Sequence, residues 1–397
     1  MLQRVERHII VNSKLHEQLC FNAARFYNFV NYHLRQVFFG KIQKISEYEM
    51  SSLLCEYDQY DFRNLPSTCS QQIIRLVYKT WSSYFKGLAE YKKHPKKFRG
   101  KPKPPKYKKK DGLGIAIFTK GQIKLKGNLA YFPKKTNLPP IQTKAKEIQQ
   151  VRIIPQATCF VVEVIYNIEP KKSNVKEDNF LSIDLGINNL ATAINNVGKQ
   201  PFIINGKPLK AHNQFYNKRK AELQSYVGDR GASNRINRLT HKRNCKVNDY
   251  LHKTSRFIID YCIEHEIGMI IIGKNDGWKN KVNIGKVNNQ KFVSIPHSKL
   301  IQQITYKAED VGIIVKEQQE SHTSKCDALA LEKICHHEKY LGKRIKRGLF
   351  QSSTGRLINA DVNGAINIAR KAKVFQNADW LLDRGVADTP IRYNIAA

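Results

Sequence analysis

A single aspartate, Asp184, stands inside an apolar stretch of the chain, in the string Phe-Leu-Ser-Ile-Asp-Leu-Gly-Ile. This stretch has the length and residue types of a buried β-strand, which we predict over residues 180–187. A lone buried carboxylate costs several kcal/mol unless it is paired or coordinates a cation. An aspartate can also satisfy a turn, but its place within an apolar strand favours a functional carboxylate.

A second aspartate, Asp361, opens a predicted helix. The apolar stripe of this helix comprises Val362, Ala365, Ile366 and Ala369. Taken alone, Asn359 and Asp361 can be helix-capping residues. Considered together with Asp184, Asp361 is better interpreted as a metal ligand than as a cap. A ribonuclease-H-like site holds two divalent ions with one aspartate in the first strand and another on the last helix. Oxygen ligands of this kind suit Mg²⁺ or Mn²⁺.

Strand and helix patterns alternate from residue 179 onwards, as in an α/β domain. We expect strands over residues 180–187, 190–195, 200–204, 268–272 and 312–318. A long helical region, 210–264, separates the third strand from the fourth. Between Lys210 and Arg256 it carries twelve Lys or Arg residues and three acidic ones. Such one-sided charge favours contact with a nucleic-acid duplex over a solvated helical face.

The first 170 residues predict helices and then a sheet. Apolar residues recur at helical spacing over 16–39 and again from about residue 67 onwards. The aromatic residues of the second helix, among them Trp81 and Phe85, are interpreted as core, with base stacking as the alternative. From 112 to 170 the pattern has period two, which predicts a small antiparallel sheet or barrel. Residues 171–178 are polar and predict a linker.

A strongly basic segment joins these two parts. Residues 92–110 contain eleven Lys or Arg, four Pro and no acidic residue. Like charges and prolines exclude a packed helix, so we expect an extended, solvated segment. A plain linker does not need this charge, and Phe98 and Tyr107 add flat faces among the cations. We therefore interpret the segment, here called the strap, as contacting nucleic acid through salt-sensitive phosphate interactions.

The net charge of +35, from 68 Lys and Arg against 33 Asp and Glu, implies a large polyanionic partner. We favour nucleic acid over an anionic membrane, because the chain lacks the run of about 18 apolar residues that spans a bilayer. Residues 1–14 are charged and do not resemble a signal peptide. The eight cysteines form no C-x-x-C pair, which indicates a reducing cytoplasm with buried thiols.

Several strings of the chain resemble the TnpB family of transposon-encoded RNA-guided DNA nucleases. They are SIDLGINNLAT, IIIGKNDGWKN, HTSKC and INADVNGAINIARK, together with KKFRGKPKPPKYKKKDG and KYLGKRIKRGLF. The resemblance covers nearly the whole chain, and the order and spacing of the strings make it specific. It implies a RuvC-type nuclease related to type V CRISPR effectors, with guide RNA and target double-stranded DNA as partners. We expect a monomeric ribonucleoprotein in a prokaryotic cytoplasm, associated with the nucleoid.

The resemblance also implies a domain organisation. A β-barrel (wedge) domain would comprise 1–14 and 100–170, and would be interrupted by a helical recognition domain over 15–99. After the linker 171–178, a ribonuclease-H-like (RuvC) nuclease domain would span 179–371, with the basic helical insert 210–264 and a basic loop 321–358. Residues 372–397 would form a tail.

One departure from the common TnpB pattern concerns the middle catalytic glutamate. Most members carry it at the end of the fourth strand, where this chain has Gly273. Glu320 follows the fifth strand, which in this fold lies beside the fourth at about 4.8 Å and ends at the same edge. We therefore assign Glu320 to the site, as in part of the family, with Asp276 and Glu317 as lesser candidates.

A second departure concerns zinc. Many TnpB proteins carry two C-x-x-C pairs before the final aspartate, and this chain has neither. Cys326, Cys335, His336 and His337 offer only a mixed set with poor spacing, so we expect no structural zinc. The cations around residue 343 instead suggest an anion-contacting loop, with a solvated surface loop as the alternative.

The predicted catalytic and metal-binding residues are Asp184, Glu320 and Asp361, which would hold two Mg²⁺ or Mn²⁺ ions. The predicted nucleic-acid-binding residues lie on the strap, on the helical insert and on the basic loop. They are Lys92, Lys93, Lys96, Lys97, Arg99, Lys101, Lys103, Lys106, Tyr107, Lys108, Lys109, Lys110, Arg235, Arg238, Lys242, Arg243, Lys343, Arg344, Lys346 and Arg347.

Three alternatives stay open at this point. The chain could be an RNA-guided repressor whose nuclease site has decayed, as Gly273 suggests. It could be a DNA transposase, since the ribonuclease-H-like fold serves both chemistries. A plain basic RNA-binding protein is the third, but it leaves Asp184 in an apolar strand unexplained.

Overall fold

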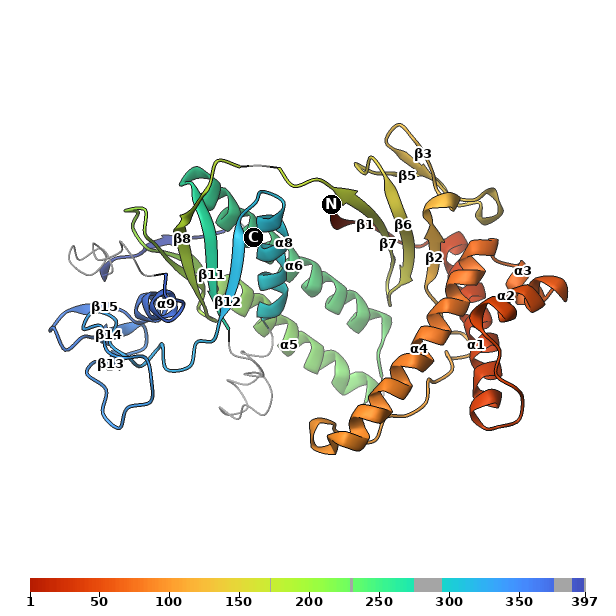
Figure 1. The fold of residues 1–397 in the computed structure, drawn as a ribbon, viewed down its shortest axis with the longest axis horizontal. Helices are drawn as coiled ribbons and strands as arrows, with labels where there is room; N and C mark the ends of the chain where they lie inside the picture. Colours follow the sequence, from red (N-terminus) through yellow and green to blue (C-terminus); the bar gives the residue numbers. More distant parts are fainter. Residues whose placement is uncertain (172, 229–230, 275–294, 375–387, 396–397) are drawn as a thin grey trace. The chain divides into compact units, whose positions relative to one another are not determined.

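The computed structural model describes residues 1–171, 173–228, 231–274, 295–374 and 388–395. The chain divides into two compact units, Met1–Ile168 and Glu169–Ala397 (Figure 1). Each unit has its own buried apolar core. The predicted residue Asp276 lies outside the described residues.

Two long helices dominate the helical part of the first unit, α1 (Lys14–Phe38) and α4 (Ser67–Lys93), with the shorter α2 (Glu47–Glu56) and α3 (Tyr60–Arg63) between them. These confirm the helices predicted from apolar spacing. The side chain of Ser13 caps α1 by accepting from the backbone N–H of His16. Phe26 of α1 and Val77 of α4 are fully buried in a core that they share with the sheet.

The strands of the first unit form two antiparallel sheets. The larger has the order β1 (Leu2–Ile10), β7 (Phe160–Ile168), β6 (Ile148–Pro155) and β2 (Ala116–Thr119). The smaller comprises β3 (Lys124–Lys126), β4 (Leu129–Tyr131) and β5 (Ile141–Gln142). Across residues 1–168, all of them described, no pairing joins β1 to β2, so the structure has open sheets where we predicted a barrel. Because residues of α1 and α4 share the core of the larger sheet, its apolar face is buried without closure.

The second unit is built on a six-stranded sheet with the order β12-β11-β8-β9-β10-β16. Its strands are β8 (Lys176–Leu185), β9 (Asn189–Asn195), β10 (Phe202–Asn205), β11 (Ile267–Gly273), β12 (Ile314–Gln318) and β16 (Ile391–Tyr393). Neighbours β8, β9 and β10 are antiparallel, whereas β11 and β12 run parallel to β8. The five predicted strands are confirmed. Two details were wrong: β8 begins inside the predicted linker, and β16 belongs to the predicted tail yet pairs with β10.

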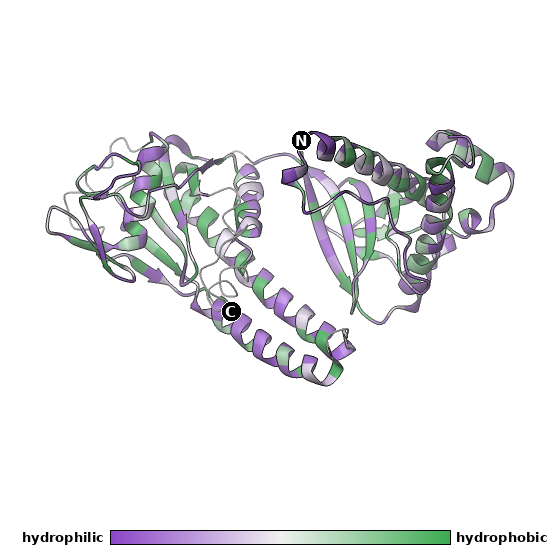
Figure 2. Cartoon of the chain, turned by 90° about the horizontal axis from the view of Figure 1, so that it is seen from below, coloured by the Kyte–Doolittle hydropathy of each residue, from purple (hydrophilic) through white to green (hydrophobic). Residues whose placement is uncertain are grey.

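Helices cover both faces of this sheet. The predicted basic helical region forms α5 (Lys207–Val227) and α6 (Asn234–Glu264), and hydrophilic residues are spread along both of them (Figure 2). Residues of α6 and α8 (His297–Glu309) share a core with Leu181 and Ile183 of β8. Residues of α9 (Ala360–Lys371) instead share a core with Phe180. Since side chains alternate along a strand, even-numbered residues of β8 face α9.

The predicted basic loop contains a small antiparallel sheet. Its strands are β13 (Lys343–Lys346), β14 (Leu349–Gln351) and β15 (Leu357–Asn359). Strand β15 leads directly into α9, where Asn359 is the N-cap and accepts from the backbone N–H groups of Asp361 and Val362. The loop therefore delivers Asp361 to the first turn of α9.

Candidate active site

Asp184 is the penultimate residue of β8, not a mid-strand residue as the apolar pattern had suggested. The strand ends early because the chain turns at Gly186, where a β-carbon would lie 2.5 Å from the carbonyl oxygen of Asn189. Asp184 has the same parity as Phe180 and Ser182, so its carboxyl group faces α9 and is only partly exposed. An apolar strand thus carries this carboxylate to the edge of the sheet.

Helix α9 lies directly against this end of β8. The hydroxyl of Ser182 donates to the carbonyl oxygen of Ala365 at 2.8 Å. A β-carbon on Gly364 would lie only 2.7 Å from Asp184 Oδ2. Glycine at this position therefore allows the helix backbone to approach the carboxylate.

Glu320 comes to the same edge from the neighbouring strands. In the parallel register Ile272 of β11 pairs with both Ile183 and Glu317, and Gly273 pairs with Gln318. The chain then carries Glu320 two residues beyond β12. Its Oε2 atom lies 2.7 Å from the position that a β-carbon on Gly273 would occupy. Ile368 of α9 shares this space, since its Cδ1 atom lies 2.5 Å from the same position. The absence of a side chain at the end of β11 thus leaves room for both Glu320 and Ile368.

Burial and the charges of the other two predicted acids act on Asp184. Burial raises the pKa of Asp184 well above its usual value, and the charges of Asp361 and Glu320 raise it further, whereas Arg344 opposes them. Burial also raises the pKa of Glu320. Glu317, a lesser candidate, instead pairs with Lys274, whose Nζ lies 2.5 Å from its carboxylate. Three acids from distant parts of the chain therefore meet at one edge of the sheet.

Asp361 is held by two side chains that sequence reasoning did not assign to this role. Asn189, the first residue of β9, donates from Nδ2 to Asp361 Oδ2 at 2.6 Å. Arg392 of β16 donates to Asn189 Oδ1 at 3.1 Å. Arg344 of β13, predicted to bind nucleic acid, lies 3.6 Å from Asp361 Oδ1. The sequence carries no local signal for the Arg392 contact, because Arg392 and Asn189 are 203 positions apart in the chain.

The donor set fits a divalent cation in its chemistry. Burial, and then the charges of Asp361 and Glu320, raise the pKa of Asp184, and a bound cation would offset the repulsion from these charges. Carboxylate oxygens are also the ligands that Mg²⁺ and Mn²⁺ prefer. Within the described residues, however, no three Asp, Glu, His or Cys side chains form a complete metal-binding group as they stand. The residues that would hold a metal ion are the three predicted acids.

Buried carboxylates organise the loop in which we considered a mixed zinc site. Asp327 is fully buried and accepts from the hydroxyl of Ser352 at 2.8 Å and from the backbone N–H of Ser353 at 2.7 Å. Asn367 of α9 donates to the carbonyl oxygen of Cys326 at 2.7 Å. Hydrogen bonds to α9 thus hold the loop beside the acids, and Asp327 was not identified from the sequence.

The strap is not extended and solvated throughout, as we predicted: Lys92 and Lys93 belong to α4, and Pro95–Lys97 form a short 3-10 helix. Its later part is docked on α1. Asn28 of α1 donates to the carbonyl oxygen of Lys108 at 3.0 Å and accepts from its backbone N–H at 2.7 Å. Arg35 donates to the carbonyl oxygen of Pro105 at 2.9 Å and stacks over Tyr107. The predicted lysines and Arg99 of the strap are exposed. Hydrogen bonds to the backbone therefore hold the strap at Pro105 and Lys108, while its cations remain exposed.

The other predicted cations divide into two groups. Arg235, Arg238 and Lys242 of α6 are exposed, as are Lys343, Lys346 and Arg347 of the loop. Arg243 is partly buried: its Nε donates to Asn213 of α5 at 2.7 Å and its guanidinium lies over Tyr216. Arg243, which we predicted to bind nucleic acid, thus also has a structural role, because it joins α5 to α6.

Comparison with known proteins identifies the family. Residues 163–279 match the family model OrfB_IS605, described as a probable transposase, and residues 297–368 match the Cas12f1-like TNB domain. The TnpB-like protein ORF457 of Acidianus two-tailed virus is 25% identical over 392 residues, which cover 88% of this chain and 81% of that protein. These matches support a protein of the TnpB family. The resemblance inferred from the sequence motifs is thereby confirmed.

Solved structures share the fold of this TnpB family member. A Cas12f1 chain from a complex with sgRNA and target DNA matches with a TM-score of 0.56 and 15% identity, over 90% of this chain and 82% of that chain. The mini-RNA-guided endonuclease CRISPR-Cas_phi3 matches with a TM-score of 0.52 and 11% identity, over 94% and 92% of the two chains. The mixed α/β fold is therefore that of the Cas12 effectors. In the described part of the chain, no helix has the length and apolar character needed to cross a membrane.

Proposed function

We propose that the chain is an RNA-guided DNA endonuclease that hydrolyses both strands of its target in a single RuvC-like site. The observation that carries this proposal is that Asp184, Glu320 and the first turn of α9, which bears Asp361, lie at one edge of the sheet. A β-carbon on Gly364 of α9 would lie 2.7 Å from Asp184 Oδ2, and one on Gly273 would lie 2.7 Å from Glu320 Oε2. Membership of the TnpB family supports a function of the RNA-guided nuclease type in general.

The topology of the second unit supports a ribonuclease-H-like assignment of the site. Three antiparallel strands, β10, β9 and β8, are followed across the sheet by the parallel strands β11 and β12. The central strand β8 bears Asp184, and ligands in such α/β sheets bind at the carboxyl ends of the parallel strands. Asp184 and Glu320 lie at that edge, and α9 adds Asp361.

The side chains around the acids prepare them for phosphodiester chemistry. Asp184, Glu320 and Asp361 would hold two Mg²⁺ or Mn²⁺ ions, which when bound would lower the pKa of an attacking water and stabilise the departing 3′ oxygen. Asn189 fixes the rotamer of Asp361 through its 2.6 Å hydrogen bond. Arg344 lies beside the same carboxylate, where its guanidinium can contact a DNA phosphate. A single site requires that the two strands are cut in turn.

Guide RNA and target DNA would occupy the basic surfaces. Base pairing with the guide would read the target, and the protein would read duplex shape and a short flanking motif. The docked strap supports this assignment, since Asn28 holds the backbone of Lys108 among the exposed cations. We expect the binding to weaken steeply with salt, because phosphate contacts release counterions.

The test uses purified chain with guide RNA and a matched plasmid in the presence of Mg²⁺. We expect Asp184→Asn and Glu320→Ala each to lower the cutting rate by at least about 100-fold, with target binding changed less than about threefold. Glu317→Gln is the matched control, because this acid lies on the same segment but pairs with Lys274. A Glu320→Ala protein that cuts at the normal rate would contradict the assignment.

Two other functions make different predictions in the same assay. A transposase is suggested by the description of the matched family model, and it would join DNA strands in the absence of guide RNA. A nuclease-deficient repressor, suggested by Gly273, would bind the programmed target without linearising it. Glu320 beside Gly273 argues against a decayed site, because a carboxylate still reaches the end of β11.

A further inference from the structure

An aromatic pocket opens between α1 and α4 in the first unit, far along the chain from the acids. Its volume is about 580 Å³, within the range of about 300–1,000 Å³ that small-ligand sites take. Leu34 and the buried Trp81 form apolar parts of its wall. Tyr78 closes another side and donates from its hydroxyl to the carbonyl oxygen of Ile45 at 2.9 Å. The pocket is therefore a built cavity and not a gap between loose side chains.

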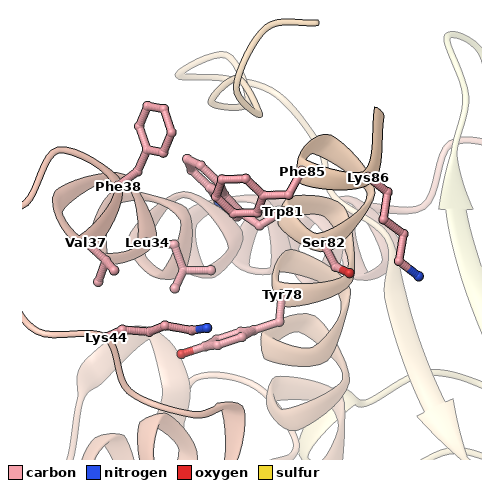
Figure 3. A pocket seen from close by; sticks show the side chains of 9 residues that line it. All are labelled: Leu34, Val37, Phe38, Lys44, Tyr78, Trp81, Ser82, Phe85 and Lys86. Atoms are coloured by element: carbon pink, nitrogen blue, oxygen red, sulfur yellow. The ribbon is translucent and has the colours of Figure 1, made fainter. Parts of the chain in front are cut away.

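Flat rings are exposed at this pocket. Phe38 is 38% exposed and Phe85 is 48% exposed, whereas Trp81 is only 4% exposed. The ring centroids of Phe38 and Trp81 are 5.4 Å apart, and those of Trp81 and Phe85 are 5.8 Å apart. Figure 3 shows the three rings gathered at one end of the pocket. The sequence interpretation of these aromatic residues as core thus holds for Trp81 but not for Phe85.

The charged residues of the pocket are both lysines. Lys44 lies beside Tyr78, and Lys86 extends from α4 away from the rings (Figure 3). Both are exposed, and across residues 1–168, all of them described, no acidic group forms a salt bridge with either. A second copy of this chain, which carries a net charge of +35, would be repelled from such a rim. The charge favours an anionic occupant, and the rings favour one with flat faces.

We propose that this pocket binds an unpaired nucleobase of a single-stranded nucleic acid. The base would stack on Phe85, and Lys44 and Lys86 would contact the flanking phosphates. Single-strand binding proteins combine aromatic faces with cations in this way, and the binding tolerates sequence because every base has a π-face. The inference rests on the proposed function, in which the strand is either guide RNA or unwound DNA.

The experiment measures the affinity of the full chain for short fluorescent oligouridine RNA and oligothymidine DNA by anisotropy. Phe85→Leu keeps the apolar volume but removes the π-face, and we expect it to weaken binding of at least one strand by about 5- to 100-fold. Phe85→Trp should restore binding. Tyr57→Leu is the matched control, because this tyrosine is 76% exposed in the same unit but lies outside the pocket.

Salt dependence tests the lysines separately. For single strands the slope of log affinity against log salt is about −0.7 for each neutralised phosphate, so Lys44→Gln with Lys86→Gln should flatten it by about 1.4. Phe85→Leu should leave the slope unchanged. A weaker affinity for RNA alone would identify the guide as the source of the base, and a weaker affinity for DNA alone would identify the target strand.

Other outcomes overturn the proposal. If Phe85→Leu binds both strands as tightly as Tyr57→Leu, the pocket holds no base, although the nuclease proposal survives. If the variant instead changes the molar mass of the chain in light scattering, the pocket docks protein. If the unaltered chain binds neither strand, both the pocket and the proposed function fail.

Discussion

The carboxylate of Glu320 reaches the space that a side chain on Gly273 would fill: its Oε2 atom lies 2.7 Å from the position of the absent β-carbon. The two residues lie on neighbouring parallel strands or just beyond them, since Gly273 pairs with Gln318. The glycine at the end of β11 thus leaves room for the carboxylate of the glutamate that follows β12.

An exchange of the two residues tests this arrangement. We expect Gly273→Ala alone to lower cutting about 10- to 100-fold, because its β-carbon would displace both Ile368 and Glu320 and a misplacement of about 1 Å can cost that much. Gly273→Glu combined with Glu320→Gly should recover much of the lost rate, since the carboxylate then reaches the site from β11. The measurement is the single-turnover cutting rate on matched plasmid. If the exchanged protein cuts no faster than Glu320→Gly alone, the two positions are not equivalent.

Replacing Gly364 of α9 by alanine should not stabilise the protein as the same replacement does in an unhindered helix. Alanine normally stabilises a helix interior by about 1 kcal/mol relative to glycine. At Gly364 the new β-carbon would lie 2.7 Å from Asp184 Oδ2, so we expect Gly364→Ala to lose cutting activity and to gain no stability.

Gly87 in α4 is the matched control for this effect. A β-carbon there meets nothing closer than 4.0 Å, so Gly87→Ala should raise the melting temperature. Calorimetry of both variants makes the comparison. Equal stabilisation by the two substitutions would mean that α9 does not approach Asp184 closely.

The hydrogen-bond relay from β16 to the acids predicts a positioning role for Arg392. Arg392 donates to Asn189, which donates to Asp361. We expect Arg392→Ala to lower cutting about two- to tenfold and to raise the Mg²⁺ concentration needed for half-maximal rate, because Asp361 is then less well oriented. Arg392→Lys should restore part of the effect. A normal Mg²⁺ dependence in Arg392→Ala would restrict β16 to a structural role.

The docked strap predicts that affinity for nucleic acid depends on uncharged contacts. Asn28→Ala removes two hydrogen bonds to the backbone of Lys108 without changing the net charge. We expect weaker RNA binding, by about two- to tenfold, together with faster trypsin cleavage within residues 92–110, because the cations must then be ordered on binding. Lys109→Gln serves as the comparison, since it should flatten the salt dependence instead. Unchanged proteolysis in Asn28→Ala would show that these hydrogen bonds do not hold the strap.

Much of the secondary structure could be predicted from local patterns. The helices α1 and α4 and the five strands of the nuclease-like sheet follow from apolar spacing, which reflects one buried face for each element. The observed boundaries differ from the predicted ones where strand pairing determines them. Strand β8 extends back to Lys176 because it pairs there with β11. The prediction of a barrel in the first unit was wrong. Periodicity predicts the strands, but it does not show whether the two edge strands of a sheet pair with each other.

By itself, the sequence determined that Asp184 needs a partner, because an apolar strand leaves a carboxylate with no local means of compensation. Only the tertiary structure decided which partners it has. The contacts of Glu320 with the Gly273 position, of Gly364 with Asp184 and of Arg392 with Asn189 join residues that are far apart in the chain. Their proximity results from strand register and helix packing, which depend on the whole core and not on any local pattern.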